Sequence, residues 1–209
     1  LDDLDAPVYA SRLTHGMISS KLREHGKLKN ARLNVVKPHA PFKTGPFQIE
    51  FFRVCHSIPD AMGIAITTPI GMVIHTGDFK IDHTPTDGNP TDFSKLARLT
   101  SEGVILLCSD STYAEVDGYS DSDQIVAEKL DHVIGKAKSR VIVATFASLI
   151  SRMQQVINAA VKHERKVTIV GRGMLNNFKM ATKMGYLDVP NGTVLSPNEA
   201  GQFPSDQLV

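Results

Sequence analysis

Three strand-like stretches of the chain each end in a short polar motif that contains potential metal ligands or catalytic groups. The motifs are residues 55–60 (CHSIPD), 75–80 (HTGDFK) and 109–112 (SDST). Each follows an alternating or continuously apolar run, such as VILLC at 104–108. We therefore predict that adjacent strands carry these side chains to one edge of a sheet, where loops gather functional groups on a rigid support.

The part of the chain before residue 139 has the pattern of a mixed sheet with surface helices. The run at 104–108 is apolar throughout, which is typical of a strand buried on both faces. The predicted elements are strands at 47–51, 63–67, 72–74 and 104–108 and helices that begin after Asp92 and after a capping box formed by Ser120 and Asp123. The 63–67 and 72–74 strands flank a Pro-Ile-Gly turn and should form a hairpin.

After Ser139 the pattern changes to strand-helix alternation. Residues 141–144 are a predicted strand, an apolar helix face runs from Ile150 to Val161, and 166–170 is a predicted second parallel strand. A further helix spans roughly 174–184, and the tail from Pro190 shows little periodicity. We predict an α/β fold, with α+β character in the first part, divided into domains 1–138 and 139–209.

Composition excludes several classes of protein. With 209 residues, 42% of them apolar, the chain is typical of a globular protein. Its two cysteines form no C-x-x-C pair, which argues against a zinc knuckle or a disulfide framework and favours a reducing cytoplasm. No apolar stretch approaches the ~20 residues that span a bilayer, so we expect no membrane partner.

Charge is unevenly distributed although the net charge is only +1. Residues 12–43 contain eight Lys or Arg residues and one acidic residue, Glu24. This segment is either a solvated loop and helix face or a surface that contacts phosphate groups, and the sequence leaves both interpretations open.

The three polar motifs combine residue types that suit a pair of divalent metal ions. Imidazole nitrogen and carboxylate oxygen are both good ligands of Zn²⁺ or Mn²⁺, and an aspartate can bridge two ions. Taken singly, each residue has a simpler explanation: a structural histidine, an Asx turn or an ordinary turn. The spacing of the whole set favours the metal site.

Four motifs, in this order and spacing, resemble the ribonuclease J family, in the β-CASP group of the metallo-β-lactamase superfamily. They are HSIPD (56–60), HTGDFK (75–80), SDST (109–112) and VATFAS (143–148), supported by DGNPTDF (87–93) and RMQQ (152–155). The similarity runs over nearly the whole chain. It implies part of a metallo-β-lactamase αββα sandwich, without its N-terminal half, followed by the first βαβ unit of a Rossmann-like β-CASP domain.

The resemblance also implies roles for particular residues. His56 would be a terminal ligand of one metal ion, Asp78 the catalytic carboxylate that bridges both ions, and Asp110 a catalytic acidic group at the domain junction. Thr145 and Ser148 would bind the RNA backbone at the N-terminus of a helix, where free N–H groups and the helix dipole attract phosphate. Ser148 could equally be the N-cap of that helix. His75 is expected to orient the turn that carries Asp78.

One departure from the family pattern affects the RNA site. After Phe-Ala-Ser the family commonly has Asn, a hydrophobic residue and then His-Arg, whereas residues 149–152 are Leu-Ile-Ser-Arg. A polar RNA contact is therefore expected to be lost. The six histidines outside the motifs are interpreted as surface residues: His15, His25, His39, His83, His132 and His163.

The implied activity of the parent protein is that of a zinc-dependent ribonuclease. It would be a cytoplasmic hydrolase that cleaves RNA by 5′-to-3′ exonuclease and endonuclease action through a metal-bridging hydroxide, with two Zn²⁺ (or Mn²⁺) ions. We expect RNA as its partner and a homo-oligomeric parent protein. Alternatives are a DNA-directed or tRNA-directed β-CASP nuclease, or a truncated paralogue acting as a non-catalytic RNA-binding or dimerisation module. The βαβ unit argues against a small-molecule hydrolase of the glyoxalase kind.

The chain itself is expected to be an inactive internal fragment. It lacks an initiator Met and the His-x-His-x-Asp-His motif with which the family supplies four ligands, so two ligands, His56 and Asp78, remain. We predict little bound metal, and two tightly held ions per molecule in elemental analysis would refute this. An uncovered sheet should also cause self-association or partial disorder. A monodisperse monomer in light scattering would count against this expectation.

Overall fold

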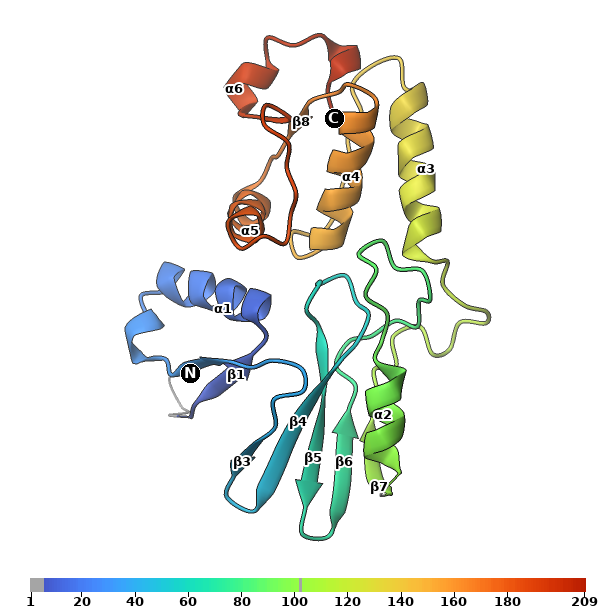
Figure 1. Cartoon of the computed structure of the whole chain (residues 1–209). Helices are drawn as coiled ribbons and strands as arrows, with labels where there is room; N and C mark the ends of the chain where they lie inside the picture. The colour runs from blue at the N-terminus through green and yellow to red at the C-terminus, as the bar shows by residue number, and fades with distance from the viewer. Residues whose placement is uncertain (1–5, 102) are drawn as a thin grey trace. The chain divides into compact units, whose positions relative to one another are not determined.

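The computed structural model of the chain describes residues 6–101 and 103–209, which form two compact units (Figure 1). The first unit holds residues 60–83 and 89–119 and the chain up to His56. The second unit holds 57–59, 84–88 and 120–209. Each unit combines sheet and helix, so the predicted α/β class, with α+β character in the first part, is confirmed.

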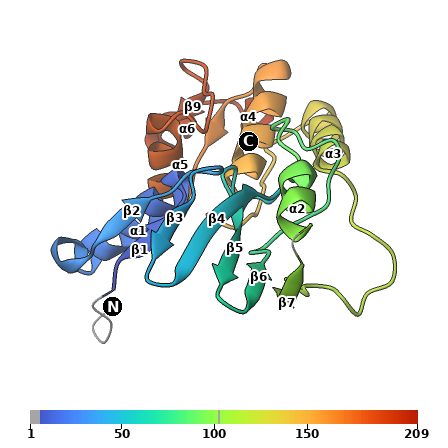
Figure 2. The same ribbon diagram turned by 60° about the horizontal axis from the view of Figure 1, so that its bottom comes forward.

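A five-stranded sheet in strand order β3-β4-β5-β6-β7 is the centre of the first unit (Figure 2). Its strands are β3 (Phe42–Thr44), β4 (Phe47–Arg53), β5 (Met62–Thr68), β6 (Gly71–His75) and β7 (Val104–Cys108). Strands β3 to β6 are antiparallel, and β7 runs parallel to β6. The predicted hairpin is confirmed: β5 and β6 join through a tight turn after Thr68, where Gly71 adopts φ +142°.

The core of this unit lies between the sheet and α2 (Phe93–Thr100). As predicted, Asp92 is the N-cap of this helix, and its carboxylate accepts a hydrogen bond from the Lys95 amide at 2.9 Å. A cluster of buried apolar side chains joins the two layers: Phe52, Val54, Ala65, Met72, Ile74 and Leu99. Packing is tight enough that a Cβ at Gly63 would lie 2.3 Å from the Phe52 ring.

The strand at 104–108 forms as predicted, but the expectation that it is buried on both faces is wrong. Ile105, Leu106 and Leu107 in β7 are 55%, 52% and 60% exposed. Among the described residues, β7 pairs only with β6 and therefore forms an edge of the sheet. Apolar composition predicts the strand, but the number of neighbouring strands decides its burial.

Residues before the sheet form elements that the sequence did not predict. They are β1 (Val8–Ala10), α1 (Arg12–Glu24), the short 3₁₀ helix η1 (Leu28–Asn30) and β2 (Leu33–Val35). Strands β1 and β2 pair in parallel, and α1 connects them with η1. Of the eight basic residues at 12–43, seven are exposed and Lys27 is half-buried, so both interpretations of this segment remain open.

Two packed helices, α3 (Asp123–Lys136) and α4 (Ile150–Lys162), form one side of the second unit (Figure 1). Ile134 packs with Val156 and Ala159 between them. The predicted capping box of Ser120 and Asp123 is wrong, because the N-cap of α3 is Ser122, whose hydroxyl accepts from the Gln124 amide at 3.2 Å. Because α3 packs on α4, it belongs to this compact unit; the predicted domain boundary at 138/139 stays a prediction.

The sheet of the second unit differs from the prediction. Residues 141–144 were expected to be a strand but form no ladder with the rest of the described chain. Instead β8 (Val167–Thr168) pairs in parallel with β9 (Val194–Leu195), which lies in the tail that shows no periodicity. The predicted helix at 174–184 is α5 (Arg172–Lys183). The tail also contains α6 (Pro197–Ala200) and the 3₁₀ helix η2 (Ser205–Gln207).

No helix in the described parts of the chain is long and apolar enough to cross a membrane.

Candidate functional site

His56 and Asp78, the two predicted metal ligands, lie side by side in the first unit. His56 follows β4, and Asp78 lies in the loop after β6. A backbone hydrogen bond of 2.8 Å from the Lys80 amide to the Cys55 carbonyl holds the two loops together. The His56 Nε2 and Asp78 Oδ2 atoms are 3.8 Å apart, with side chains 29% and 80% exposed. The pair is therefore open to solvent and to a ligand.

The turn that carries Asp78 is fixed by hydrogen bonds at the end of β6. The Gly77 amide donates to His75 Nδ1 at 3.0 Å, so the expectation that His75 orients this turn is confirmed. Gly77 has φ +64°, and a Cβ there would lie 3.0 Å from the Met62 carbonyl oxygen. Both features favour glycine at this position. The turn is thus built to present Asp78 in one place.

Asp110 organises the loop after β7. Its Oδ1 accepts hydrogen bonds from the Thr112 amide at 2.9 Å and the Thr112 hydroxyl at 2.7 Å, and its Oδ2 accepts from the Phe79 amide at 3.4 Å. The hydrogen bonds of Thr112 chiefly, then that of Phe79 and the nearby His56, hold the pKa of Asp110 below its ordinary value. The turn interpretation of Asp110 is therefore correct, and its catalytic role stays a prediction.

The donor set of His56 and Asp78 fits a divalent metal ion but is small. One imidazole nitrogen and one carboxylate oxygen that face each other are typical ligands of Zn²⁺ or Mn²⁺. In the parts of the chain that the structure describes, no group of three or more His, Cys, Asp or Glu residues is arranged to hold a metal ion. The role of His56 and Asp78 as metal ligands therefore stays a prediction.

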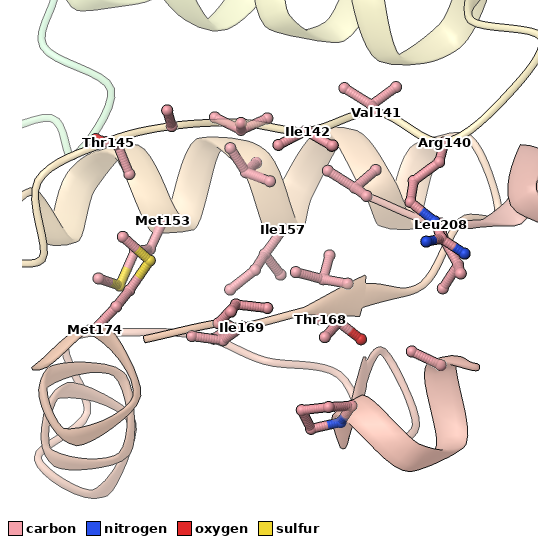
Figure 3. Close-up of a pocket in the computed structure, with 18 of the residues that line it drawn as sticks. Arg140, Val141, Ile142, Thr145, Met153, Ile157, Thr168, Ile169, Met174 and Leu208 are labelled. Carbon is pink, nitrogen blue, oxygen red and sulfur yellow. The ribbon is translucent and has the colours of Figure 1, made fainter. Parts of the chain in front are cut away.

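Thr145 and Ser148 lie in the second unit, in the segment before α4, where residues 147–148 form a turn. Figure 3 shows Thr145 in this segment, which runs alongside α4. The alternative interpretation of Ser148 as the N-cap of this helix is wrong: the N-cap is Leu149, without a side-chain cap. The Ser148 carbonyl instead accepts from the Ile150 amide at 2.9 Å. The RNA-binding role of Thr145 and Ser148 stays a prediction.

The first turn of α4 already has one protein partner. The Ser57 carbonyl accepts hydrogen bonds from the Ser151 amide at 3.4 Å and from the Ser151 hydroxyl at 3.3 Å. A phosphate group at this helix end would therefore find fewer free donors than the sequence suggests.

Two further residues acquire roles that sequence reasoning missed. Asp60, in the first motif, accepts from the Ser11 hydroxyl at 2.9 Å and the Leu13 amide at 2.8 Å, and so fixes the start of α1. His163 was interpreted as a surface residue, but it is half-buried and its Nε2 lies 2.9 Å from Asp131 Oδ1. Their partners lie more than 30 residues away along the chain, and no local pattern identifies them.

Residues 138–209, which comprise most of the second unit, match the family model described as "Ribonuclease J, beta-CASP domain". Curated relatives extend the similarity to nearly the whole chain. Ribonuclease J of Corynebacterium glutamicum is 46% identical over 98% of this chain, that of Thermus thermophilus 44% over 97%, and one from Helicobacter pylori 39% over 99%. The chain belongs to the ribonuclease J family.

The match covers only part of each relative. The chain spans 28% of the Corynebacterium protein, 36% of the Thermus protein and 30% of the Helicobacter protein, about a third of their length. A crystal structure of a protein of unknown function from Enterococcus faecalis V583 superposes with a TM-score of 0.69, at 16% identity, over 97% of this chain and 52% of that one. This likeness concerns the fold alone.

Proposed function

We propose that the protein carrying this chain is a metal-dependent ribonuclease that hydrolyses phosphodiester bonds in RNA. The observation that carries the proposal is the pair of His56 and Asp78, held 3.8 Å apart by bridged loops in a chain of the ribonuclease J family. We extend it to 5′-to-3′ exonuclease and endonuclease action, to Zn²⁺ or Mn²⁺ as the cofactor and to the cytoplasm as its location.

Each site residue has a distinct part in this proposal. His56 and Asp78 would hold the metal, which when bound supplies an activated hydroxide and neutralises charge on the transferring phosphate. Asp110, whose pKa is held low mainly by Thr112, is anionic at neutral pH. Through the Phe79 amide it fixes the residue next to Asp78. Thr145 and Ser148 would contact the RNA backbone.

The proposal is tested by substitution in the whole protein that carries this chain. We expect Asp78→Asn and His56→Ala each to lower cleavage of a labelled single-stranded RNA at least a hundredfold, with a loss of bound metal in elemental analysis. The matched controls are Asp117→Asn and His132→Ala, which change exposed residues of the same types. Cleavage that persists at full rate in both site variants would refute the proposal. DNA and tRNA substrates in the same assay address the related nuclease alternatives.

A second function, RNA binding without cleavage, is favoured by one observation on the chain alone. Seven exposed basic residues lie in 12–43, whereas only two residues, His56 and Asp78, are proposed as metal ligands, and no group of three or more possible ligands is found among the described residues. This function predicts that the chain binds a labelled RNA, that binding weakens steeply between about 50 and 200 mM salt, and that the RNA stays intact. Cleavage by the chain with added Zn²⁺ or Mn²⁺ would exclude it.

A further inference from the structure

Tyr113 has a backbone conformation that an aromatic residue rarely adopts. Its φ angle is +60°, in the left-handed region, where Gly and Asn are the usual residues. It is the third residue of a turn that is closed by a 3.0 Å hydrogen bond from the Ala114 amide to the Ser111 carbonyl. A turn with positive φ at this position alone ordinarily has Gly or Asn there. The turn itself therefore does not explain the tyrosine.

Packing within the chain does not explain this residue either. Tyr113 is 78% exposed, and in the parts of the chain that the structure describes its ring makes no hydrogen bond and no ring contact. An aromatic side chain stabilises a fold mainly through the area that it buries, which is small here. Backbone strain that the fold does not require occurs chiefly at active sites and ligand sites.

The turn is fastened to the loop of the candidate metal site. Thr112, the residue before Tyr113, donates its amide and its hydroxyl to Asp110. Asp110 also accepts a hydrogen bond of 3.4 Å from the Phe79 amide, next to Asp78. Three peptide units of 3.8 Å each place the Tyr113 Cα at most about 11 Å from that of Asp110. The ring is thus attached, through a short and well-bonded loop, to the loop that carries Asp78.

The charges near Tyr113 determine which part of a nucleic acid this loop can contact. Residues 99–128 contain no Lys or Arg, and Glu115, two residues after Tyr113, is exposed. Phosphate is attracted by cations, which this stretch lacks, and it is repelled by the carboxylate. An aromatic face stacks on any nucleobase and needs no positive charge. The loop is therefore suited to a base and not to the phosphate backbone.

We propose that Tyr113 is a base-stacking residue of the RNA site, whose ring stacks on an unpaired nucleobase close to the phosphate at His56 and Asp78. The assignment rests on the proposed nuclease function, because it needs RNA at that site. Stacking on the face of a base reads no sequence, so Tyr113 selects single-stranded RNA of any sequence. In a duplex the bases are already stacked on one another, and the ring adds nothing.

The test uses the whole protein that carries this chain and a fluorescently labelled single-stranded RNA. Tyr113→Asn is the informative variant, because Asn suits the left-handed turn but has no aromatic ring. We expect it to weaken RNA binding about tenfold without lowering the melting temperature. Tyr113→Phe keeps the ring and should bind RNA as the wild type does. Tyr119→Asn, at a tyrosine that is 97% exposed on the same loop, is the matched control and should also leave binding unchanged.

A set of RNAs that each lack one base near the cleaved phosphate separates stacking from a structural effect. One abasic position should weaken binding by the wild type about tenfold but leave binding by Tyr113→Asn nearly unchanged, because the stacking partner is already absent. Wild-type affinity in Tyr113→Asn, an equal loss in Tyr113→Phe, or the same response of both proteins to every abasic RNA would overturn the proposal.

Binding is measured with EDTA present, so that it does not depend on turnover. A protein that binds RNA through Tyr113 but cleaves none when metal is supplied would refute the nuclease function and leave the stacking assignment intact. A protein that cleaves RNA while Tyr113→Asn binds it normally would refute the stacking assignment alone. Absence of RNA binding by the wild type would refute both.

Discussion

Replacement of Asp60 by alanine removes a carboxylate that holds the start of α1. Asp60 accepts from the Ser11 hydroxyl at 2.9 Å and from the Leu13 amide at 2.8 Å, and Ser11 is the N-cap of the helix. The Ser11 side chain makes no capping hydrogen bond of its own. Asp60, which lies 47 positions after Leu13, instead accepts the hydrogen bond of the Leu13 amide.

The expected cost follows from the burial of the helix start. Leu13 is 0% exposed and Ser11 is 7% exposed, so water cannot easily replace the missing acceptor. A buried donor without a partner costs about 1–3 kcal/mol, and a negative charge at a helix N-terminus contributes about 0.3–1 kcal/mol more. We expect Asp60→Ala to lower the free energy of opening of the α1 region by about 3 kcal/mol, roughly a hundredfold in its opening equilibrium.

Hydrogen exchange is the suitable assay, because a chain of two compact units need not unfold in one step. The amide of Leu13 should exchange about a hundredfold faster in Asp60→Ala, whereas amides of α4 keep their rates. Asp117→Ala, at an exposed aspartate, should change neither. Asp60→Asn retains one acceptor oxygen and should show an intermediate effect. Unchanged exchange at Leu13 in Asp60→Ala would refute the assignment of this carboxylate as the anchor of α1.

Three further predictions concern packing and charge. Gly135→Ala places a Cβ 2.5 Å from the His163 ring and should destabilise the chain by about 1–2 kcal/mol in urea unfolding, but should be neutral or stabilising in a His163→Ala background. Asp131 has its pKa lowered chiefly by the Lys162 ammonium, so its folded-state pKa lies below the unfolded value. The contribution of Asp131 to the stability of the folded state is therefore present above about pH 4 and lost as the pH falls. Asp131→Asn should weaken the dependence of the melting temperature on pH in the acid range. An unchanged dependence would contradict this prediction. Ile74→Ala, at a side chain 2% exposed, should lower the free energy of unfolding by about 3 kcal/mol, because it leaves a cavity in the core. A loss below about 1 kcal/mol would mean that the core around α2 rearranges to fill this cavity.

The sequence by itself determined the elements whose signals are local. The hairpin of β5 and β6 follows from two alternating runs around a Pro-Ile-Gly turn, and α2 follows from the cap at Asp92. The closeness of His56 and Asp78 was also predicted, because strand ends meet at one edge of a sheet. These features depend on residues within about ten positions of one another or on a simple rule of sheet geometry. The expectation that adjacent strands carry the two residues is wrong, because β4 and β6 lie on either side of β5.

Only the tertiary structure decided which groups are covered and which are paired. β7 is apolar throughout, yet its exposure depends on how many strands flank it. Residues 141–144 have strand composition, but a ladder needs a partner backbone, and Val141 alone of these bonds to residue 208. Asp60 and α1 meet across 47 residues of chain. Periodicity reports the preference of a segment for an extended or helical shape, whereas pairing and burial are set by segments that are distant in sequence.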